Sequence, residues 1–132
     1  MGVYAIRAIY AYILGILNVT TQKEGEIMLE SYFENKLRVS VQALGHGVKC
    51  LKFESPGFTG VPDRIILLPG GKVIFVEMKQ PGKKERKRQE YVQGLLRDLG
   101  FEVFSSVDSL GRIVAVVERC KEVMKSEGIR TT

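Results

Sequence analysis

The residue types that most often build metal and hydrolase sites are scarce in this sequence. Its 132 residues include one histidine, two cysteines and no tryptophan. A single histidine, His46, makes a zinc site or a Ser-His-Asp triad hard to build. His46 stands between two glycines, so we expect it in a loop, without a catalytic part.

The two cysteines, Cys50 and Cys120, do not have the spacing of a metal-binding motif. A domain of this length buries enough of its surface to fold without disulfides. We therefore expect free, buried thiols and a cytoplasmic protein.

The sequence also lacks an apolar run of membrane-spanning length. Residues 3–17 are nearly all apolar but include Arg7, and they fall short of the roughly 20 residues that a spanning helix needs. Two interpretations stay open. Residues 3–17 form a helix that packs on the domain, on a second copy or on a membrane surface, or residues 1–27 are an upstream extension and Met28 is the natural start. We expect no membrane partner, and a single domain over residues 28–132.

Positive charge is the main compositional feature. The net charge is +5, and it falls entirely within residues 28–132 because residues 1–27 carry two charges of each sign. A basic domain of this kind suggests a polyanionic partner. The predicted phosphate-contacting residues are Lys52, Arg64, Lys83, Lys84, Arg86, Lys87 and Arg88. Aromatic residues are few, and the sequence reveals no base-stacking platform of the single-strand-binding type.

Apolar periodicity predicts a mixed sheet with helices packed against it. We expect helices over residues 28–44 and 85–99 and a last helix from residue 108 or 109, with strands over residues 48–53, 63–68, 72–79 and 101–107. The helix over residues 85–99 has an apolar stripe of Val92, Leu95, Leu96 and Leu99. The element order, α-β-β-β-α-β-α, belongs to the α/β class.

Two strands of this arrangement form a hairpin around Pro69-Gly70-Gly71. A three-residue turn pairs Leu68 with Lys72, and continuing that register places Asp63 opposite Glu77. Residues opposite each other in an antiparallel pair point to the same face, and Lys79 shares it because it is two positions from Glu77.

Two carboxylates that converge at strand ends repel each other, and a divalent cation relieves the repulsion. Oxygen ligands favour Mg²⁺ or Mn²⁺ over Zn²⁺. A lysine beside the ion can orient or deprotonate a water that attacks a phosphate. The alternative is an ordinary surface salt bridge among Asp63, Glu77 and Lys79.

The pattern extends beyond these three residues. It comprises Ala43-Leu44-Gly45, Lys52-Phe53, Gly60-Val61-Pro62-Asp63-Arg64, the LPGGKV turn, Val76-Glu77-Met78-Lys79, Gln89 and Asp108-Ser109. Over roughly residues 28–110 it resembles the virus-type replication-repair nuclease (VRR-NUC) domain of the PD-(D/E)xK superfamily. The resemblance implies a restriction-endonuclease-like αβββαβ core with a mixed central sheet flanked by helices.

The resemblance also implies roles for individual residues. Asp63, Glu77 and the backbone carbonyl of Met78 would bind the metal, Lys79 would position or activate the water, and Gln89 would hold the site together from its helix. Such nucleases use an acidic residue of the first helix as well. Helical spacing favours Glu34 for this position, with Glu30, one turn earlier, as the alternative.

The implied activity is Mg²⁺- or Mn²⁺-dependent hydrolysis of DNA phosphodiester bonds. A stand-alone phage or bacterial domain of this type is implied to act as a homodimer in DNA repair, on branched DNA such as four-way Holliday junctions. Two-fold symmetry suits the cutting of two strands in a symmetric junction. The alternative is a non-catalytic nucleic-acid-binding subunit that retains the nuclease fold.

Overall fold

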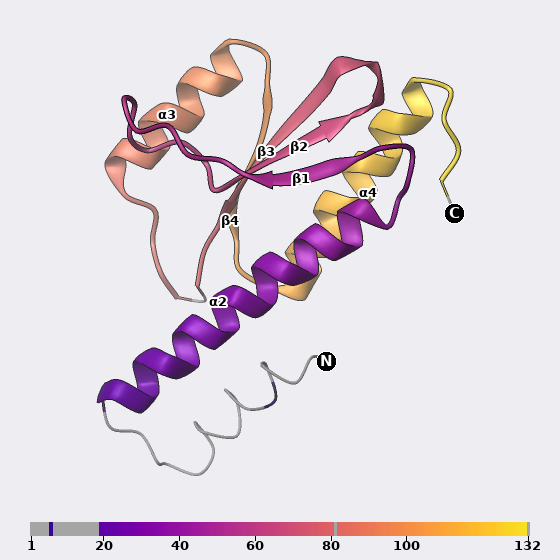
Figure 1. Ribbon diagram of the computed structural model, residues 1–132. Helices are drawn as coiled ribbons and strands as arrows, with labels where there is room; N and C mark the ends of the chain where they lie inside the picture. Colours follow the sequence, from indigo (N-terminus) through magenta and orange to yellow (C-terminus); the bar gives the residue numbers. More distant parts are fainter. Residues whose placement is uncertain (1–5, 7–18, 81, 132) are drawn as a thin grey trace.

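The computed structural model describes residue 6, residues 19–80 and residues 82–131 (Figure 1). The elements, in chain order, are α2 (Val19–Gln42), β1 (Lys49–Lys52), β2 (Arg64–Leu68), the 3₁₀ turn η1 (Pro69–Gly71), β3 (Lys72–Met78), α3 (Lys87–Asp98), β4 (Glu102–Val107) and α4 (Leu110–Ser126). This order confirms the α/β arrangement predicted from apolar periodicity. No helix among the described residues has the length and apolar character needed to cross a membrane.

The sheet is mixed, in the order β1-β2-β3-β4. The β1–β2 and β2–β3 pairs are antiparallel, whereas β3 and β4 run parallel and are connected through α3. Helices α2 and α4 lie side by side along one face of the sheet, and α3 lies on the other side (Figure 1).

The β2–β3 hairpin has the predicted register. Leu68 pairs with Lys72, Ile66 pairs with Ile74, and the pairing continues to Arg64 and Val76. Gly70 turns the chain at a φ of 79°, a conformation that glycine adopts without strain. One further step of the same register brings Asp63 opposite Glu77.

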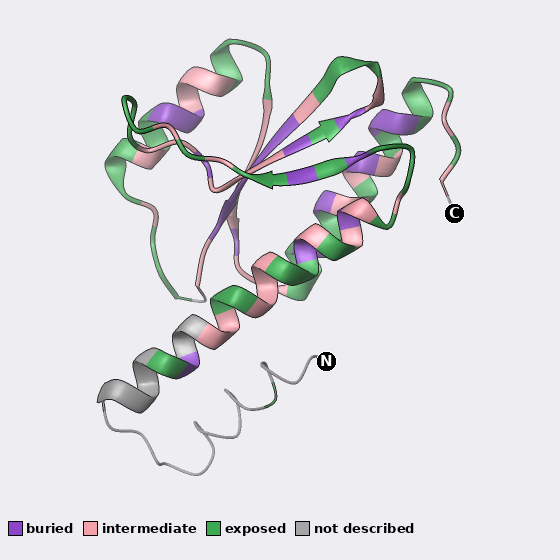
Figure 2. Cartoon of the chain, in the orientation of Figure 1, coloured by how far each residue is buried: buried purple, intermediate pink, exposed green. Residues whose placement is uncertain are grey.

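The core lies between the sheet and the α2–α4 pair. Buried positions gather on the sides of both helices that face the sheet (Figure 2). The fully or almost fully buried residues of the core include Leu37, Val41, Ile66, Ile74, Val76, Val116 and Cys120. Both cysteines are buried free thiols. Burial raises the pKa of Cys50 to about 11 and that of Cys120 to about 12, so neither is a reactive thiolate near neutral pH.

The first helix is longer at its start than the apolar stripe predicted. It begins at Val19 instead of residue 28 and ends at Gln42 instead of residue 44. Residues 19–27 contain no proline, so nothing interrupts the helical backbone there. The proposed boundary between residues 27 and 28 falls inside this helix and stays a prediction. The interpretations of residues 3–17 concern a segment outside the described residues.

The predicted apolar stripe of α3 is wrong at its end. Leu99 is 74% exposed, whereas Gln93, one residue after the buried Val92, is 1% exposed. The helix ends at Asp98, so Leu99 leaves the face that packs on the sheet. Gln93 is tolerated inside because its amide nitrogen donates to Glu85 and its oxygen accepts from the Ser105 hydroxyl.

Candidate active site

Asp63 extends the hairpin ladder with its side chain. Its Oδ2 accepts a hydrogen bond of 2.8 Å from the backbone N–H of Met78, the residue after Glu77 on β3. Its carbonyl oxygen accepts a hydrogen bond of 2.7 Å from the N–H of Phe53. The carboxylate is therefore held at the end of β2 by the same register that pairs the strands.

Glu77 is buried beside it, at 1% exposure. Its Oε1 accepts from Lys79 Nζ at 3.4 Å and from Gln89 Nε2 at 3.1 Å. Its Oε2 is buried without a hydrogen-bond partner among the described residues. Burial, and then the charge of Asp63, raise the pKa of Glu77 from 4.5 to about 8, although Lys79 acts in the opposite direction.

Gln89 connects the start of α3 to these charges. Its Oε1 accepts from Lys79 Nζ at 2.8 Å and from the backbone N–H of Arg86 at 3.1 Å, while its amide nitrogen donates to Glu77. The side chain thus caps the helix and fixes the orientations of Lys79 and Glu77 together. This geometry agrees with the connecting role that the family resemblance implies.

A β-bulge lies directly opposite Glu77. Val76 pairs with Phe104 and Met78 with Val107, so Ser105 and Ser106 together face the single residue Glu77. Ser106 has a φ of 50°, which is uncommon for a residue other than glycine. Bulges are frequent next to active sites, where they re-aim side chains.

The carboxylate of Glu85 holds this bulge. Its Oε1 accepts from the N–H of Ser106 at 3.1 Å, from the Ser106 hydroxyl at 3.1 Å and from Gln93 Nε2 at 3.2 Å. These contacts draw Glu85 toward β4, and α3 begins at Lys87 rather than at residue 85. Sequence reasoning missed Glu85, because it stands in a basic run and its partner in β4 is 21 residues away.

The site residues line an open cavity of about 440 Å³. Its walls are Glu30, Asp63, Glu77, Met78, Lys79, Gln80, Lys83, Lys84, Arg86 and Gln89. The predicted carboxylates, lysine, glutamine and part of the basic run are therefore brought together. Carboxyl groups lie deep in the cavity, and exposed basic side chains form its rim. This arrangement suits a cation and a phosphate bound in the same place.

The two candidate carboxylates of α2 have different environments. Glu30 lines the cavity, and its Oε2 accepts from Gln80 Nε2 at 2.9 Å. Glu34 is not among the lining residues, and it pairs with Arg64 at 3.4 Å. The position in the cavity favours Glu30, whereas helical spacing favoured Glu34.

The predicted phosphate-contacting residues fall into two groups, those that line the cavity and those that do not. Lys83, Lys84 and Arg86 line the cavity. Lys52 has a side chain that is 67% exposed but lies outside the cavity wall, and Lys87 is exposed and outside as well. Arg64 has only 13% of its side chain exposed and is engaged by Glu34, so it is poorly placed for a phosphate.

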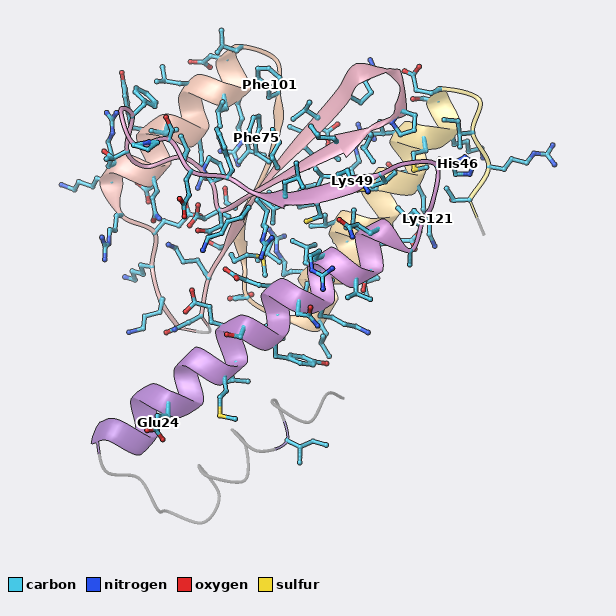
Figure 3. All side chains as sticks on the ribbon, in the orientation of Figure 1. Glu24, His46, Lys49, Phe75, Phe101 and Lys121 are labelled. Carbon is cyan, nitrogen blue, oxygen red and sulfur yellow. The ribbon has the colours of Figure 1, made fainter. Side chains whose placement is uncertain are left out.

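His46 lies in the loop after α2, close to the C-terminal segment (Figure 3). Its Nε2 is 3.2 Å from the backbone oxygen of Arg130. It is absent from the wall of the cavity, in agreement with the loop role predicted for it.

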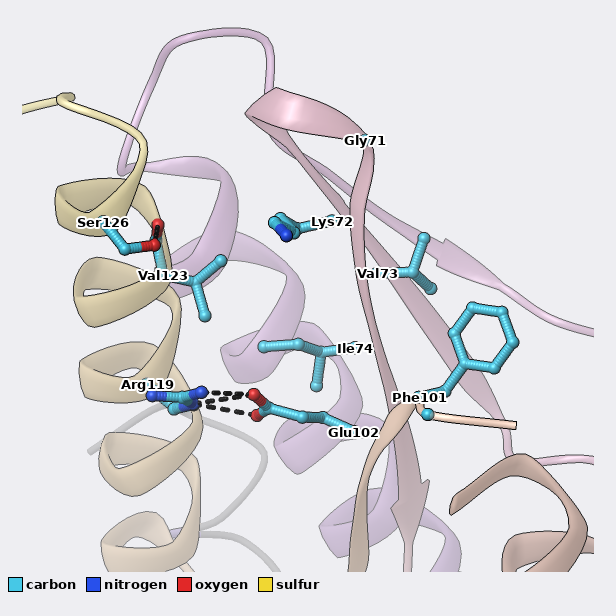
Figure 4. A pocket seen from close by; sticks show the side chains of 10 residues that line it. Gly71, Lys72, Val73, Ile74, Phe101, Glu102, Arg119, Val123 and Ser126 are labelled. Carbon is cyan, nitrogen blue, oxygen red and sulfur yellow. Dashed lines mark hydrogen bonds and ion pairs between the residues drawn. The ribbon is translucent and has the colours of Figure 1, made fainter. Parts of the chain in front are cut away.

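A second cavity, of about 330 Å³, lies between α4 and the beginnings of β3 and β4 (Figure 4). The Arg119 guanidinium donates to both carboxylate oxygens of Glu102, and these hydrogen bonds lower the pKa of Glu102. Because the two charges satisfy each other, this cavity lacks the unpartnered carboxylate oxygen of the first one.

The donor chemistry of the first cavity fits a hard divalent cation. Asp63 and Glu77 supply carboxylate oxygens, Glu77 Oε2 is a buried acceptor without a partner among the described residues, and Met78 lines the wall. Among the residues that the structure describes, no three His, Cys, Asp or Glu side chains converge as a ready metal cluster. Two carboxylates and a carbonyl would thus form the minimal ligand set.

Comparison with known proteins agrees with the fold. No protein-family model matches the chain. Over 77 residues the chain is 43% identical to "Putative nuclease p44" of Acyrthosiphon pisum secondary endosymbiont phage 1. The aligned region covers 58% of this chain and 81% of that protein. A solved structure described as "VRR_NUC domain" is similar with a TM-score of 0.61 and 26% identity, over 68% of this chain and 95% of that one. The chain belongs to the VRR-NUC family of nuclease domains, whose α/β fold it shares.

Proposed function

We propose that this protein is a metal-dependent DNA endonuclease that hydrolyses phosphodiester bonds in the cavity around Glu77. One observation carries the proposal. Glu77 is buried beside Asp63 and Lys79 in a cavity with a basic rim, and its Oε2 has no hydrogen-bond partner in the part of the chain that the structure describes. A buried carboxylate with an unsatisfied oxygen is costly unless a ligand compensates it. The phage relative with "nuclease" in its name supports the same activity.

Asp63, Glu77 and the carbonyl of Met78 would hold Mg²⁺ or Mn²⁺, with Glu30 as the acidic residue contributed by α2. Such an ion, when bound, polarises the phosphate and makes its bound water more acidic. The fixed register of the hairpin preorganises the two carboxylates, so little rearrangement is needed on binding.

Lys79 would hold the attacking water with its ammonium group. Gln89 accepts from that ammonium at 2.8 Å and so limits the positions that it can take. Lys83, Lys84 and Arg86 on the cavity rim would neutralise phosphates on either side of the scissile bond. Separate parts of the cavity would then bind the cation, place the water and position the strand.

The substrate that we propose is branched DNA, such as a four-way junction, cut by a homodimer in the cytoplasm of a bacterial host. The relative encoded by a phage supports a role in phage replication or repair. A two-fold dimer would present two equivalent cavities to a symmetric junction.

The test is a cleavage panel of single-stranded, duplex, flap and four-way-junction DNA, with Mg²⁺, Mn²⁺ or EDTA. We expect cleavage that requires the metal and is highest on branched substrates. Asp63→Asn and Lys79→Ala should each lower the rate by at least about 100-fold, since metal and water placement supply several kcal/mol. Variants purified in parallel guard against a contaminating nuclease. Undiminished cleavage by Asp63→Asn would refute the assignment.

The same panel tests the rival function, a nucleic-acid-binding subunit without catalysis. The absence of a three-carboxylate cluster among the described side chains is the observation that favours this rival. Tight DNA binding with no nicking of supercoiled plasmid in Mn²⁺ would support it against the endonuclease.

A further inference from the structure

Two exposed aromatic rings from distant parts of the sequence meet around one arginine. The Arg88 guanidinium carbon lies 4.7 Å from the ring centre of Phe58 and 5.3 Å from that of Tyr91. Phe58 is 42% exposed and Tyr91 is 56% exposed. The three side chains, here called the aromatic clamp, therefore present ring surface and positive charge to solvent together.

The clamp is anchored rather than loosely placed. Arg88 Nε donates to the carbonyl oxygen of Thr59 at 3.0 Å. The adjacent Gly60 packs so closely on α3 that a β-carbon there would lie 2.8 Å from Arg88 Cγ and 3.2 Å from a Val92 methyl group. The loop that carries Phe58 and the helix that carries Tyr91 are consequently held in one arrangement.

The clamp is built from the two segments that also carry the proposed active site. Arg88 directly precedes Gln89 on α3, and the loop with Phe58 and Thr59 leads into Asp63. The cavity and the clamp therefore share α3, since Gln89 lines the cavity and its neighbour Arg88 belongs to the clamp. A DNA strand whose phosphate occupies the cavity can reach both places.

The chemistry of the clamp selects one kind of occupant. Exposed rings beside a guanidinium are suited to flat, π-rich groups, and nucleobases stack on both aromatic and arginine planes. The neighbouring cations Lys84 and Lys87 are complementary to a phosphate backbone rather than to a basic or neutral surface. In an intact duplex the base faces are already stacked, so only unpaired bases can enter.

We propose that the aromatic clamp binds an unpaired nucleobase adjacent to the scissile phosphate and thereby selects DNA that carries a single-stranded arm. The proposal rests on the endonuclease function, since it places the clamp beside a phosphate in the cavity. It adds an unpaired base to the features of branched DNA that are recognised, so that a flap or a junction with an unpaired arm binds more tightly than a fully paired one. An apolar protein partner on the same surface is the competing outcome.

The first test measures DNA affinity by fluorescence anisotropy, with Ca²⁺ in place of Mg²⁺. Two probes share one sequence, and only one carries an unpaired arm. The double variant Phe58→Ala/Tyr91→Ala should bind the armed probe about 5- to 150-fold more weakly, because a stacked base contributes about 1–3 kcal/mol. Its affinity for the blunt duplex should change less than about threefold. Leu99→Ala, at an exposed apolar position of the same helical region, is the matched control.

The second test detects stacking directly. A 2-aminopurine placed in the unpaired arm should lose fluorescence on binding the wild-type protein and Tyr91→Phe, which keeps the ring, but not on binding the double variant. Equal weakening on both probes would overturn the proposal in favour of a general backbone contact. Unchanged affinity of the double variant for both probes would show that the clamp does not contact DNA. If the mass of the wild type rises with concentration and that of the double variant does not, the clamp is a contact between protein molecules.

The outcomes also separate this proposal from the endonuclease function. If the wild type cleaves DNA in a metal-dependent way and the double variant keeps the same preference for armed over duplex DNA, the clamp proposal is overturned and the endonuclease function stands. Ring-dependent binding of the armed probe without cleavage in Mg²⁺ or Mn²⁺ would support the clamp and refute the endonuclease.

Discussion

Glu77 is a buried carboxyl group whose ionised form is not fully compensated by the residues that the structure describes. Gln89 and Lys79 donate to one of its oxygens and leave the other without a partner among the described residues. Functional residues are often kept in environments that oppose their ionised form, because the same environment strengthens their interaction with a ligand. A carboxyl group whose ionised form is destabilised by the fold is thus well prepared to bind a cation.

This environment predicts how metal-free stability depends on pH. The pKa of Glu77 is about 8 in the folded protein and near 4.5 in the unfolded chain. Between these values the folded state binds more protons, so stability falls as pH rises from about 5 to about 8. In EDTA, the melting temperature of the wild type relative to Glu77→Gln should fall by at least about 5 °C over this range.

Scanning calorimetry or circular dichroism measures this difference directly. Glu54→Gln is the control, since the Glu54 side chain is 73% exposed and its removal should leave the pH profile unchanged. Adding Mg²⁺ should raise the wild-type melting temperature more at pH 8 than at pH 5. A parallel pH dependence in wild type and Glu77→Gln would contradict the assigned environment.

At the scale of the elements, local geometry decides what a sequence can predict. The convergence of Asp63 and Glu77 follows from a three-residue turn and the two-residue period of strands, both local, and the register is as predicted. The choice between Glu30 and Glu34 depends on how α2 crosses the sheet, which the whole core determines. The bulge at Ser105 and Ser106 depends on Glu85, a partner 21 residues away.

Gly60 is a glycine whose replacement should destabilise the fold. Its φ is 91°, and an added β-carbon would approach both the backbone and the side chain of Arg88. Gly60→Ala should therefore lower the free energy of unfolding by about 1–3 kcal/mol. Urea denaturation measures the change. Gly57→Ala, in the same loop with no atom within 4 Å of the added carbon, is the matched control and should be close to neutral.

The bulge supports a separate prediction about Glu85. Removing its carboxylate leaves the N–H of Ser106 without its acceptor, a loss of about 1–3 kcal/mol. If the bulge aims Glu77 into the cavity, Glu85→Ala should lower kcat more than it weakens DNA binding. Glu85→Gln keeps an oxygen that can accept from Ser106 and should recover much of the rate. A loss of stability without a change in kcat in the folded variant would limit Glu85 to a structural role.

At the scale of the whole molecule, the charges are arranged as an acidic centre inside a basic surface. The net charge of +5 understates both the acidic centre and the basic surface, because their charges partly cancel in the sum. Composition alone predicts an affinity for polyanions but not its location, because the basic run spans the cavity rim, the start of α3 and the clamp. Folding places Lys83 and Lys84 at the cavity and pairs the half-buried Arg64 with Glu34, a division that no count of charges could provide.

This division makes salt dependence informative about position. A protein that neutralises phosphates loses affinity linearly in log–log plots against salt, with a slope of about 0.9 per phosphate contact on duplex DNA. Lys83→Ala/Lys84→Ala should therefore flatten the slope by about 1 to 2, equally for armed and blunt DNA. Lys125→Ala, which removes an exposed cation of α4 that is not part of the cavity wall, should leave the slope unchanged. If both variants flatten the slope alike, DNA is attracted by the net charge of the protein as a whole and is not bound specifically at the cavity rim. If only the first does, the rim positions the strand, and the selectivity for unpaired bases has to come from the clamp, because phosphate contacts carry no information about pairing.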